Sequence, residues 1–535
     1  MKHIFIKIIS EKKKSFIFLT LINIFVTAIG VLLPYLNGKF IDLLTLRVRY
    51  NIILEMCLFI LAIGLASVIL FYIKQILEAG IRLKSAYSIK LKVVEQVRKI
   101  PILIYKKFNP SYLNHRTEQD ISDIVAFIIA NYATVFINFV QILVLLFIIF
   151  KISKNITIIM LIFLPIYYFA YLKFRKPLYD RSYEAKETQN SFFNSLNDQF
   201  TFLEDIKINA NDEYNNKYLF LQFNDYFKKY INYIKTSGKF SSLDGIISIV
   251  FQVATFLQGG WETLNGRMSI GELTIICTYF AMALQVIKYY FELGKTYQNV
   301  KTSVNRLNEI FDIEVEQDGK LIIEKINVIS CDLTFKYEGD KNLIEKIKID
   351  LEKGNICSIV GKNGSGKSTI SKLLIGILNT GDVYYNENNI SSINMKNLRS
   401  QHILYISQSL NYPNRTIDEI YREFNENISL NEVLEKIKEM NLNDEEDIIN
   451  LYNQNWNKNV NSLSGGEKQI ISILKCIVRD AEFIIFDEPT SNLDANRAEI
   501  FLNIIKYLQK QQKLLLIITH DLSLADVSDS LIELC

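Results

Sequence analysis

A glycine-rich run that ends in Lys, Ser and Thr is the strongest chemical signal in the 535-residue sequence. Glycines at such spacings let backbone N–H groups close around phosphate, and a helix that starts after them adds the positive end of its dipole. Lys367 can then reach the β- and γ-phosphates of a nucleoside triphosphate, and Ser368 can ligate Mg²⁺. The run follows a strand-like segment at 356–360 and comprises Gly361, Lys362, Asn363, Gly364, Ser365, Gly366, Lys367, Ser368 and Thr369.

Two acids at the end of a second apolar run complement this phosphate loop. Residues 483–486 are all apolar and predict a buried strand, which delivers Asp487 and Glu488 at its end. We expect Asp487 to hold Mg²⁺ and Glu488 to polarise a water for attack on the γ-phosphate. The alternative interpretation is a pair of acids that start a helix before Pro489.

A third segment, Leu463-Ser464-Gly465-Gly466-Glu467, lies between these two. Ser464 and Glu467 have the S-x-x-E spacing of a capping box before a predicted helix. A cap does not need the glycine pair Gly465–Gly466, whereas close approach to phosphate does. The segment is therefore a second candidate phosphate contact.

The composition divides the chain into two unlike halves. With 60 basic and 57 acidic residues the net charge is only +3, which argues against a dedicated nucleic-acid binder. The 49% hydrophobic content excludes disorder. The six cysteines contain no CxxC pair and the four histidines form no metal-ligand cluster, so reduced thiols are expected. About the first 290 residues hold long apolar runs, and about the last 220 alternate strand-like and helical segments as a parallel α/β domain does.

Six uncharged segments predict membrane helices, because about 20 apolar residues cross the hydrocarbon core. The last two are shorter and more polar, and buried soluble helices are their alternative interpretation. Polar side chains in or near these two (Gln252, Thr255, Gln258, Thr278 and Gln285) indicate either a water-filled cavity or hydrogen bonds between helices. The six segments are residues 15–38, 56–73, 124–150, 155–172, 245–261 and 273–287.

Basic residues predict the topology. They are concentrated at 82–116 and 173–235, whereas the connections on the opposite side carry few. The positive-inside rule places these two long segments, both termini and the C-terminal half in the cytosol. Their pattern is helical, so we expect them to extend the membrane helices beyond the bilayer; solvated hairpins without a function are the alternative.

Taken together, the chain resembles the ATP-binding cassette exporters over nearly all its length. The resemblance implies an all-α six-helix transmembrane domain at 1–315 followed by an α/β P-loop nucleotide-binding domain at 321–535, with ATP and Mg²⁺ as cofactors. Segments near 108–114 and 199–207 would be coupling helices that rest on the nucleotide-binding domains. The runs 266–273 and 304–310 resemble the family's entry to and exit from the sixth span.

The resemblance also implies roles for residues that would be unremarkable in isolation. Leu463–Glu467 resembles the signature motif, in which Ser464, Gly465 and Gly466 complete the ATP site of the opposite subunit. Gln408 resembles the glutamine that links Mg²⁺ to the membrane half, and Asp494 resembles the D-loop aspartate. His520 resembles the histidine that contacts the γ-phosphate, and Tyr337 resembles the aromatic residue that stacks on adenine.

The sequence departs from the family pattern before and within the signature. Glu467 stands where glutamine is common, and residues 456–462 lack the acidic-glycine element that transmits motion in exporters. No N-terminal peptidase domain is expected, because the first span begins near residue 15.

We therefore expect a half-size exporter that pairs with an identical chain or a paralogue in a bacterial plasma membrane. A charge-poor cavity favours an amphipathic or apolar cargo, such as a peptide, a lipid or a drug-like molecule. Two alternatives remain: a sensor or gating protein that hydrolyses ATP without pumping, against which Glu488 and His520 count, and an importer, against which the fused domains count.

Overall fold

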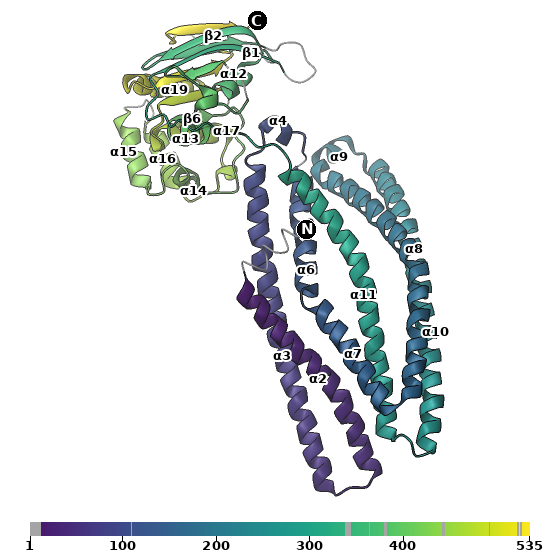
Figure 1. Ribbon diagram of the computed structural model, residues 1–535. Helices are drawn as coiled ribbons and strands as arrows, with labels where there is room; N and C mark the ends of the chain where they lie inside the picture. The colour runs from purple at the N-terminus through teal and green to yellow at the C-terminus, as the bar shows by residue number, and fades with distance from the viewer. Residues whose placement is uncertain are drawn as a thin grey trace. The chain divides into compact units, whose positions relative to one another are not determined.

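The computed structural model describes residues 12–108, 110–336, 344–362, 364–378, 382–440, 445–491, 493–521, 524 and 527–534. These residues form two compact units (Figure 1). One contains the described residues of 1–96 and 109–312 and is helical. The other contains residues 97–108 together with the described residues from 313 onward, and it carries both β-sheets.

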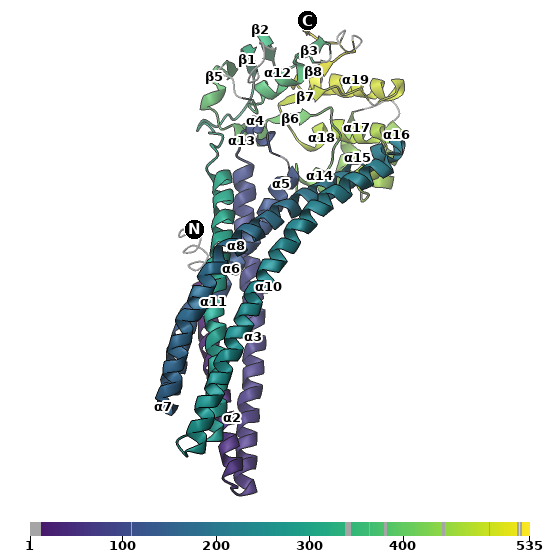
Figure 2. The same cartoon turned by 90° about the vertical axis from the view of Figure 1, so that its right-hand side faces the viewer.

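The helical unit is built from a few very long helices joined by short connections. In chain order they are α2 (Lys13–Thr45), α3 (Tyr50–Val97), α5 (Pro110–His115), the π-helical turn η1 (Arg116–Asp120), α6 (Ile121–Asn131), α7 (Thr134–Ile152), α8 (Lys154–Thr201), α9 (Leu203–Asn209), α10 (Asp212–Leu264) and α11 (Ile270–Phe311). Helices α8 and α10 lie side by side, as both views show (Figures 1 and 2).

Among the residues that the structure describes, six helical segments are long and apolar enough to cross a membrane, which confirms the six predicted spans. The two shorter and more polar predicted spans, at 245–261 and 273–287, belong to α10 and α11, which have 53 and 42 residues. At about 1.5 Å per residue, α10 is roughly 80 Å long, far more than the ~30 Å hydrocarbon core, so the helices do extend beyond their apolar stretches. The third span is interrupted, because α6 ends at Asn131 and α7 begins at Thr134.

Two glycines allow α2 and α11 to pack in direct backbone contact. A Cβ added at Gly271 would lie 2.0 Å from the carbonyl oxygen of Gly38, and one at Gly38 would lie 2.6 Å from that of Gly271. One turn along α2, Asp42 accepts hydrogen bonds from the Gly271 N–H (2.8 Å) and the Ser269 hydroxyl (2.9 Å). Asp42 therefore caps the N-terminus of α11 and joins it to the end of α2.

The second unit contains a five-stranded parallel sheet and a four-stranded antiparallel sheet. The parallel sheet has the order β6-β7-β8-β3-β9, and the antiparallel one β2-β1-β4-β5. Their bounds are β1 (Val328–Phe335), β2 (Ile344–Glu352), β3 (Ile356–Gly361), β4 (Val383–Tyr385), β5 (Asn388–Asn389), β6 (Ile403–Ile406), β7 (Phe483–Asp487), β8 (Leu514–Thr519) and β9 (Ser530–Leu534).

The central strands β7 and β8 are buried throughout, so they are apolar at every position rather than at alternate ones. Alternate residues face two cores. Phe483 and Ile485 pack with α12 (Lys367–Leu374) and the antiparallel sheet, whereas Ile484 and Phe486 pack with helices on the other face. The remaining helices are α13 (Met395–Gln401), α14 (Ile417–Arg422), α15 (Leu430–Glu439), α16 (Glu445–Asn455), α17 (Gly465–Ile473), α18 (Lys475–Val478) and α19 (Ala495–Lys510), with 3₁₀ turns η2 (Ile390–Ser392) and η3 (Val460–Ser462).

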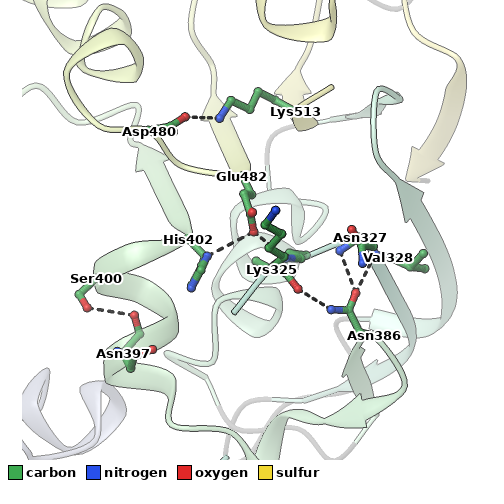
Figure 3. Close-up of polar contacts among 11 residues, drawn as sticks. Lys325, Asn327, Val328, Asn386, Asn397, Ser400, His402, Asp480, Glu482 and Lys513 are labelled. Carbon is green, nitrogen blue, oxygen red and sulfur yellow. Dashed lines mark hydrogen bonds and ion pairs between the residues drawn. The ribbon is translucent and has the colours of Figure 1, made fainter. Parts of the chain in front are cut away.

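The segment that leads into β1 is held by two side chains, Asn386 directly after β4 and Glu482 directly before β7 (Figure 3). Asn386 accepts hydrogen bonds from the N–H groups of Asn327 and Val328. Glu482, just before β7, accepts one from the N–H of Ile326 (2.6 Å) and lies 3.2 Å from Nδ1 of His402. These contacts fix where the chain enters the antiparallel sheet relative to the parallel one.

A short helix from the 97–108 segment also belongs to this unit. In α4 (Ile102–Tyr105), Ile102 and Leu103 pack against the core that includes α12. This helix precedes the coupling segment predicted near 108–114, where the structure has α5 in the helical unit. The second predicted segment, near 199–207, spans the end of α8 and most of α9.

Candidate nucleotide-binding site

The glycine-rich loop stands in the strand–loop–helix context that its spacing predicts. It leaves β3 at Gly361 and enters α12 at Lys367. Gly364 (φ 87°) and Gly366 (φ 96°) adopt the left-handed conformation that favours glycine. Gly366 occupies the N-cap position of α12, so the first N–H groups of this helix face the loop.

Lys367 is the buried cation of this loop, with 7% of its side chain exposed. Its Nζ donates to the carbonyl oxygens of Gly361 (2.5 Å) and Lys362 (3.2 Å), and it lies 3.8 Å from Oε1 of Glu488. Backbone carbonyls and one carboxylate thus hold the ammonium group at the loop, where an anion would find it already oriented.

Asp487, at the end of β7, contacts the loop helix and one further side chain. Its Oδ1 accepts a hydrogen bond from Ser368 Oγ (3.2 Å), and its Oδ2 accepts one from Tyr405 Oη (2.6 Å). Burial and the neighbouring Asp487 carboxylate raise the pKa of Tyr405, which keeps the phenol protonated as a donor.

Sequence reasoning did not identify Tyr405, because its role depends on strand pairing. Tyr405 lies opposite Ile485 in the β6–β7 ladder, two residues before Asp487. A signal was present, since a tyrosine in an otherwise apolar strand needs a partner for its hydroxyl.

Glu488 adopts a left-handed backbone conformation that is rare for a residue with a side chain, with φ at 51°. Its N–H donates to the carbonyl oxygen of Ile518 on β8 (2.8 Å), which holds the backbone in place. Its buried carboxylate lies 2.6 Å from Nδ1 of His520 through Oε2. The kink therefore turns Glu488 towards the end of β8 and the loop lysine.

The other predicted site residues lie outside the group formed by Lys367, Ser368, Asp487 and Glu488. Ser464 caps α17 in a reciprocal capping box with Glu467, as the spacing predicted, and this bonding lowers the pKa of Glu467. Asp494 caps α19, and together with His520 it lines a cavity of about 590 Å³. Gln408 is exposed in the loop after β6. Tyr337 and Asn363 lie outside the described residues.

The side chains at the glycine-rich loop suit a bound nucleotide phosphate better than a metal ion coordinated by protein groups alone. Ser365 Oγ is buried in the loop and has no hydrogen-bond partner among the described residues. The same part of the chain contains no cluster of three His, Cys, Asp or Glu side chains. A divalent cation at Ser368 and Asp487 would therefore depend on phosphate oxygens and water for its remaining ligands.

The chain is similar to known transport proteins over almost its whole length. The family description "ABC transporter transmembrane region" matches residues 16–287, and "ABC transporter" matches residues 344–491. The transport/processing ATP-binding protein ComA of Streptococcus pneumoniae is 23% identical over 89% of this chain and 68% of its own. The lactococcin-A transport/processing protein LcnC of Lactococcus lactis is 23% identical over 99% and 74%.

Two further similarities extend this result. The microcin-J25 export protein McjD of Escherichia coli is 28% identical over 55% of this chain and 51% of its own. The solved structure of a bacterial Atm1-family ABC exporter with ATP bound superposes with a TM-score of 0.80 at 16% identity, covering 98% of this chain and 94% of the other. The predicted fold class is confirmed, and so is the ATP-binding domain. The chain belongs to the ABC transporter family, as an exporter-type multi-pass membrane protein that couples ATP hydrolysis to transport.

Proposed function

We propose that the site at the ends of β3, β7 and β8 binds ATP with Mg²⁺ and hydrolyses it. The convergence of Lys367, Asp487, Glu488 and His520 at one edge of the sheet carries this proposal. The loop N–H groups and Lys367 would hold the phosphates, while Ser368, Asp487 and Gln408 would face Mg²⁺, which neutralises phosphate charge when bound. Glu488 would orient and polarise the attacking water, and His520 would hold Glu488 and contact the γ-phosphate.

The second half of each ATP site would come from another chain. Within the described part of the chain, no hydrogen bond or ion pair joins Ser464, Gly465 or Gly466 to the phosphate loop, and Ser464 bonds to Glu467 instead. The N-terminus of α17 nevertheless offers N–H groups to an anion, as a phosphate contact requires. We assign Ser464–Gly466 to ATP held by a partner subunit, an identical chain or a paralogue, with Asp494 at the seam between them and Tyr337 against adenine.

The cargo we infer is an amphipathic or apolar peptide exported from a bacterial cytoplasm. Curated relatives include proteins that transport lactococcin and export microcin, although a lipid A-core flippase is also similar. The membrane domain would comprise 1–315 and the cassette 321–535. The basic residues at 82–116 and 173–235 favour a cytosolic location for the termini and for the cassette.

Reconstitution tests this proposal. The full-length protein in proteoliposomes should hydrolyse ATP and move a synthetic amphipathic peptide across the bilayer only when ATP is present. A fluorescent phospholipid in the same vesicles tests lipid as the cargo. If ATP is hydrolysed while neither molecule moves, the proposed peptide cargo fails, and so does the lipid alternative.

A further inference from the structure

A cavity of about 750 Å³ lies between α8, α10 and α11 of the helical unit. Its position is set by where three predicted spans end: Tyr171 is at the end of the 155–172 span, Asp244 directly precedes the 245–261 span, and Lys288 directly follows the 273–287 span. The cavity therefore lies at one boundary of the membrane, where apolar sequence gives way to charged sequence. By the charge distribution this is the cytosolic boundary.

Stacked aromatic rings form one wall. Tyr171 and Phe291 stack with centroids 3.8 Å apart, Tyr167 stacks on the same Phe291 at 5.6 Å, and Phe240 contacts Tyr171 edge-on. The Tyr171 hydroxyl donates to the carbonyl oxygen of Phe291 (3.2 Å), which fixes the stack. Such a wall accommodates an aromatic or branched aliphatic side chain, because planar rings offer a large apolar area at little cost in conformational entropy.

A second wall offers charge of both signs. Asp244 Oδ2 pairs with Lys288 Nζ at 2.7 Å, which ties α10 to α11. The other oxygen, Oδ1, is buried beside the buried Tyr167 hydroxyl; Asp244 and Tyr167 interact as a hydrogen-bonding pair, although neither atom completes a hydrogen bond of good geometry. An ionised carboxylate has about four acceptor sites on its two oxygens, so Asp244 can accept a well-aligned ligand N–H in addition to these contacts.

Positive charge predominates around this ion pair. Arg175 and Lys176 line the cavity from α8 and have no ion-pair partner among the described residues. Together with Lys288 they outnumber the lining acids Asp244 and Glu292 by three to two. The cavity thus combines an apolar aromatic surface, an acceptor for an N–H and a surplus cation in one lining.

We propose that this cavity binds the carboxyl-terminal residue of a peptide cargo. A C-terminal aromatic or aliphatic residue carries these three complementary groups on one Cα: a side chain for the Tyr171–Phe291 stack, a backbone N–H for Asp244 Oδ1, and a carboxylate for Lys288, Arg175 and Lys176. An anionic lipid headgroup such as phosphatidylglycerol fits less well, because it carries no N–H for Asp244 and no rigid apolar side chain for the Tyr171–Phe291 stack. This inference rests on the proposed peptide-export function.

The probe is dansyl-Ala-Leu-Phe with a free carboxylate, compared with the same peptide as a carboxamide. Binding to the purified full-length protein is followed by fluorescence anisotropy without ATP. Loss of a charged hydrogen-bonding partner predicts that the amide binds about tenfold more weakly or worse. Arg175→Gln should reduce the difference in affinity between the acid and the amide peptide. Gly294→Leu should lower the affinity for both peptides, because a Cβ at Gly294 already lies 3.7 Å from Tyr171 Oη.

Lys154→Gln is the matched control, since Lys154 is a membrane-boundary lysine at the other end of α8, near the Phe150 ring. It should bind both peptides as the unaltered chain does. Equal affinity for acid and amide, or displacement of the acid peptide by phosphatidylglycerol but not by phosphatidylcholine, would overturn the inference in favour of a lipid site or none. The assay needs no ATP turnover, so a failure to hydrolyse ATP counts against the proposed function, whereas equal acid and amide affinities count against this inference alone.

Discussion

Nδ1 of His520 lies 2.6 Å from Oε2 of Glu488, although His520 is mostly exposed and Glu488 is buried, with 63% and 6% of their side chains accessible. The two residues come from the ends of different strands, β8 and β7, which pair in parallel. Oε1 of the same carboxylate lies 3.8 Å from Lys367 Nζ. One carboxylate is thus oriented from two sides, by a histidine and by the loop lysine.

Replacing this carboxylate tests its role in hydrolysis. Glu488→Gln should bind ATP with Mg²⁺ much as the unaltered protein does but hydrolyse it roughly 10²–10⁴-fold more slowly, which is the typical contribution of a group that activates a nucleophile. Phosphate release and nucleotide binding are measured on the same preparation. Turnover near the unaltered rate would move the base elsewhere, with His520 the next candidate.

Removing the Tyr405 hydroxyl tests whether it positions Asp487. Tyr405→Phe deletes the 2.6 Å hydrogen bond to Asp487 Oδ2 and leaves the ring in place. Because hydrogen bonds to charged groups contribute about 1.5–3 kcal/mol, the Mg²⁺ concentration for half-maximal ATPase should rise roughly tenfold. Tyr384→Phe on β4, whose ring is half-exposed, is the matched control. If the Mg²⁺ concentration for half-maximal ATPase is unchanged while the thermal stability changes, Tyr405 stabilises the fold and does not position Asp487.

Mixing two inactive chains tests the shared ATP site. Ser464→Arg places bulk and positive charge at the N-terminus of α17, and Lys367→Ala removes the phosphate-loop cation. In a mixed dimer one site carries both changes and the other carries neither, so part of the ATPase activity should return. A verified mixed dimer without activity would mean that both sites must function or that Ser464 does not act across the dimer. Activity in a verified monomer would exclude the shared site.

Thiol labelling tests the predicted orientation. Asn265, at the C-terminus of α10, and Asn209, at the end of α9, are both exposed. With Cys57 and Cys277 replaced by Ser, a cysteine at 265 should react with an impermeant maleimide in intact cells. One at 209 should react only after the cells are permeabilised. The reverse pattern would contradict the six-span topology with cytosolic termini.

The backbone contact between α2 and α11 predicts a large effect of one methyl group. Gly271→Ala would place a Cβ 2.0 Å from Gly38 O, so the helices must separate, at a cost of about 1–3 kcal/mol typical of overpacking. Gly245→Ala on α10 is the control, because its Cβ meets nothing within 4 Å. Thermal unfolding in detergent should show a lower Tm for the first variant and an equal or higher one for the second.

Much of the chemistry could be predicted from the sequence because it depends on local spacing. The glycines of residues 361–366 need only a strand before them and a helix after them, and Ser464 and Glu467 form their capping box within one helical turn. The spans could be predicted from apolar length alone, since the hydrocarbon core has a fixed thickness. The break between α6 and α7 was not predicted, because no proline or charge marks Tyr132 and Ala133.

Strand order and helix rotation decided the rest. Tyr405 reaches Asp487 only because β6 pairs with β7, and His520 reaches Glu488 only because β7 pairs with β8 and Glu488 adopts a positive φ. The Gly38–Gly271 contact and the Asp244–Lys288 pair join residues far apart in the chain. The sequence alone determined which groups occur and which local elements carry them. Long-range packing decided which of these groups come into contact. Contacts between distant segments depend on how whole strands pair and how whole helices rotate, and local spacing does not constrain either.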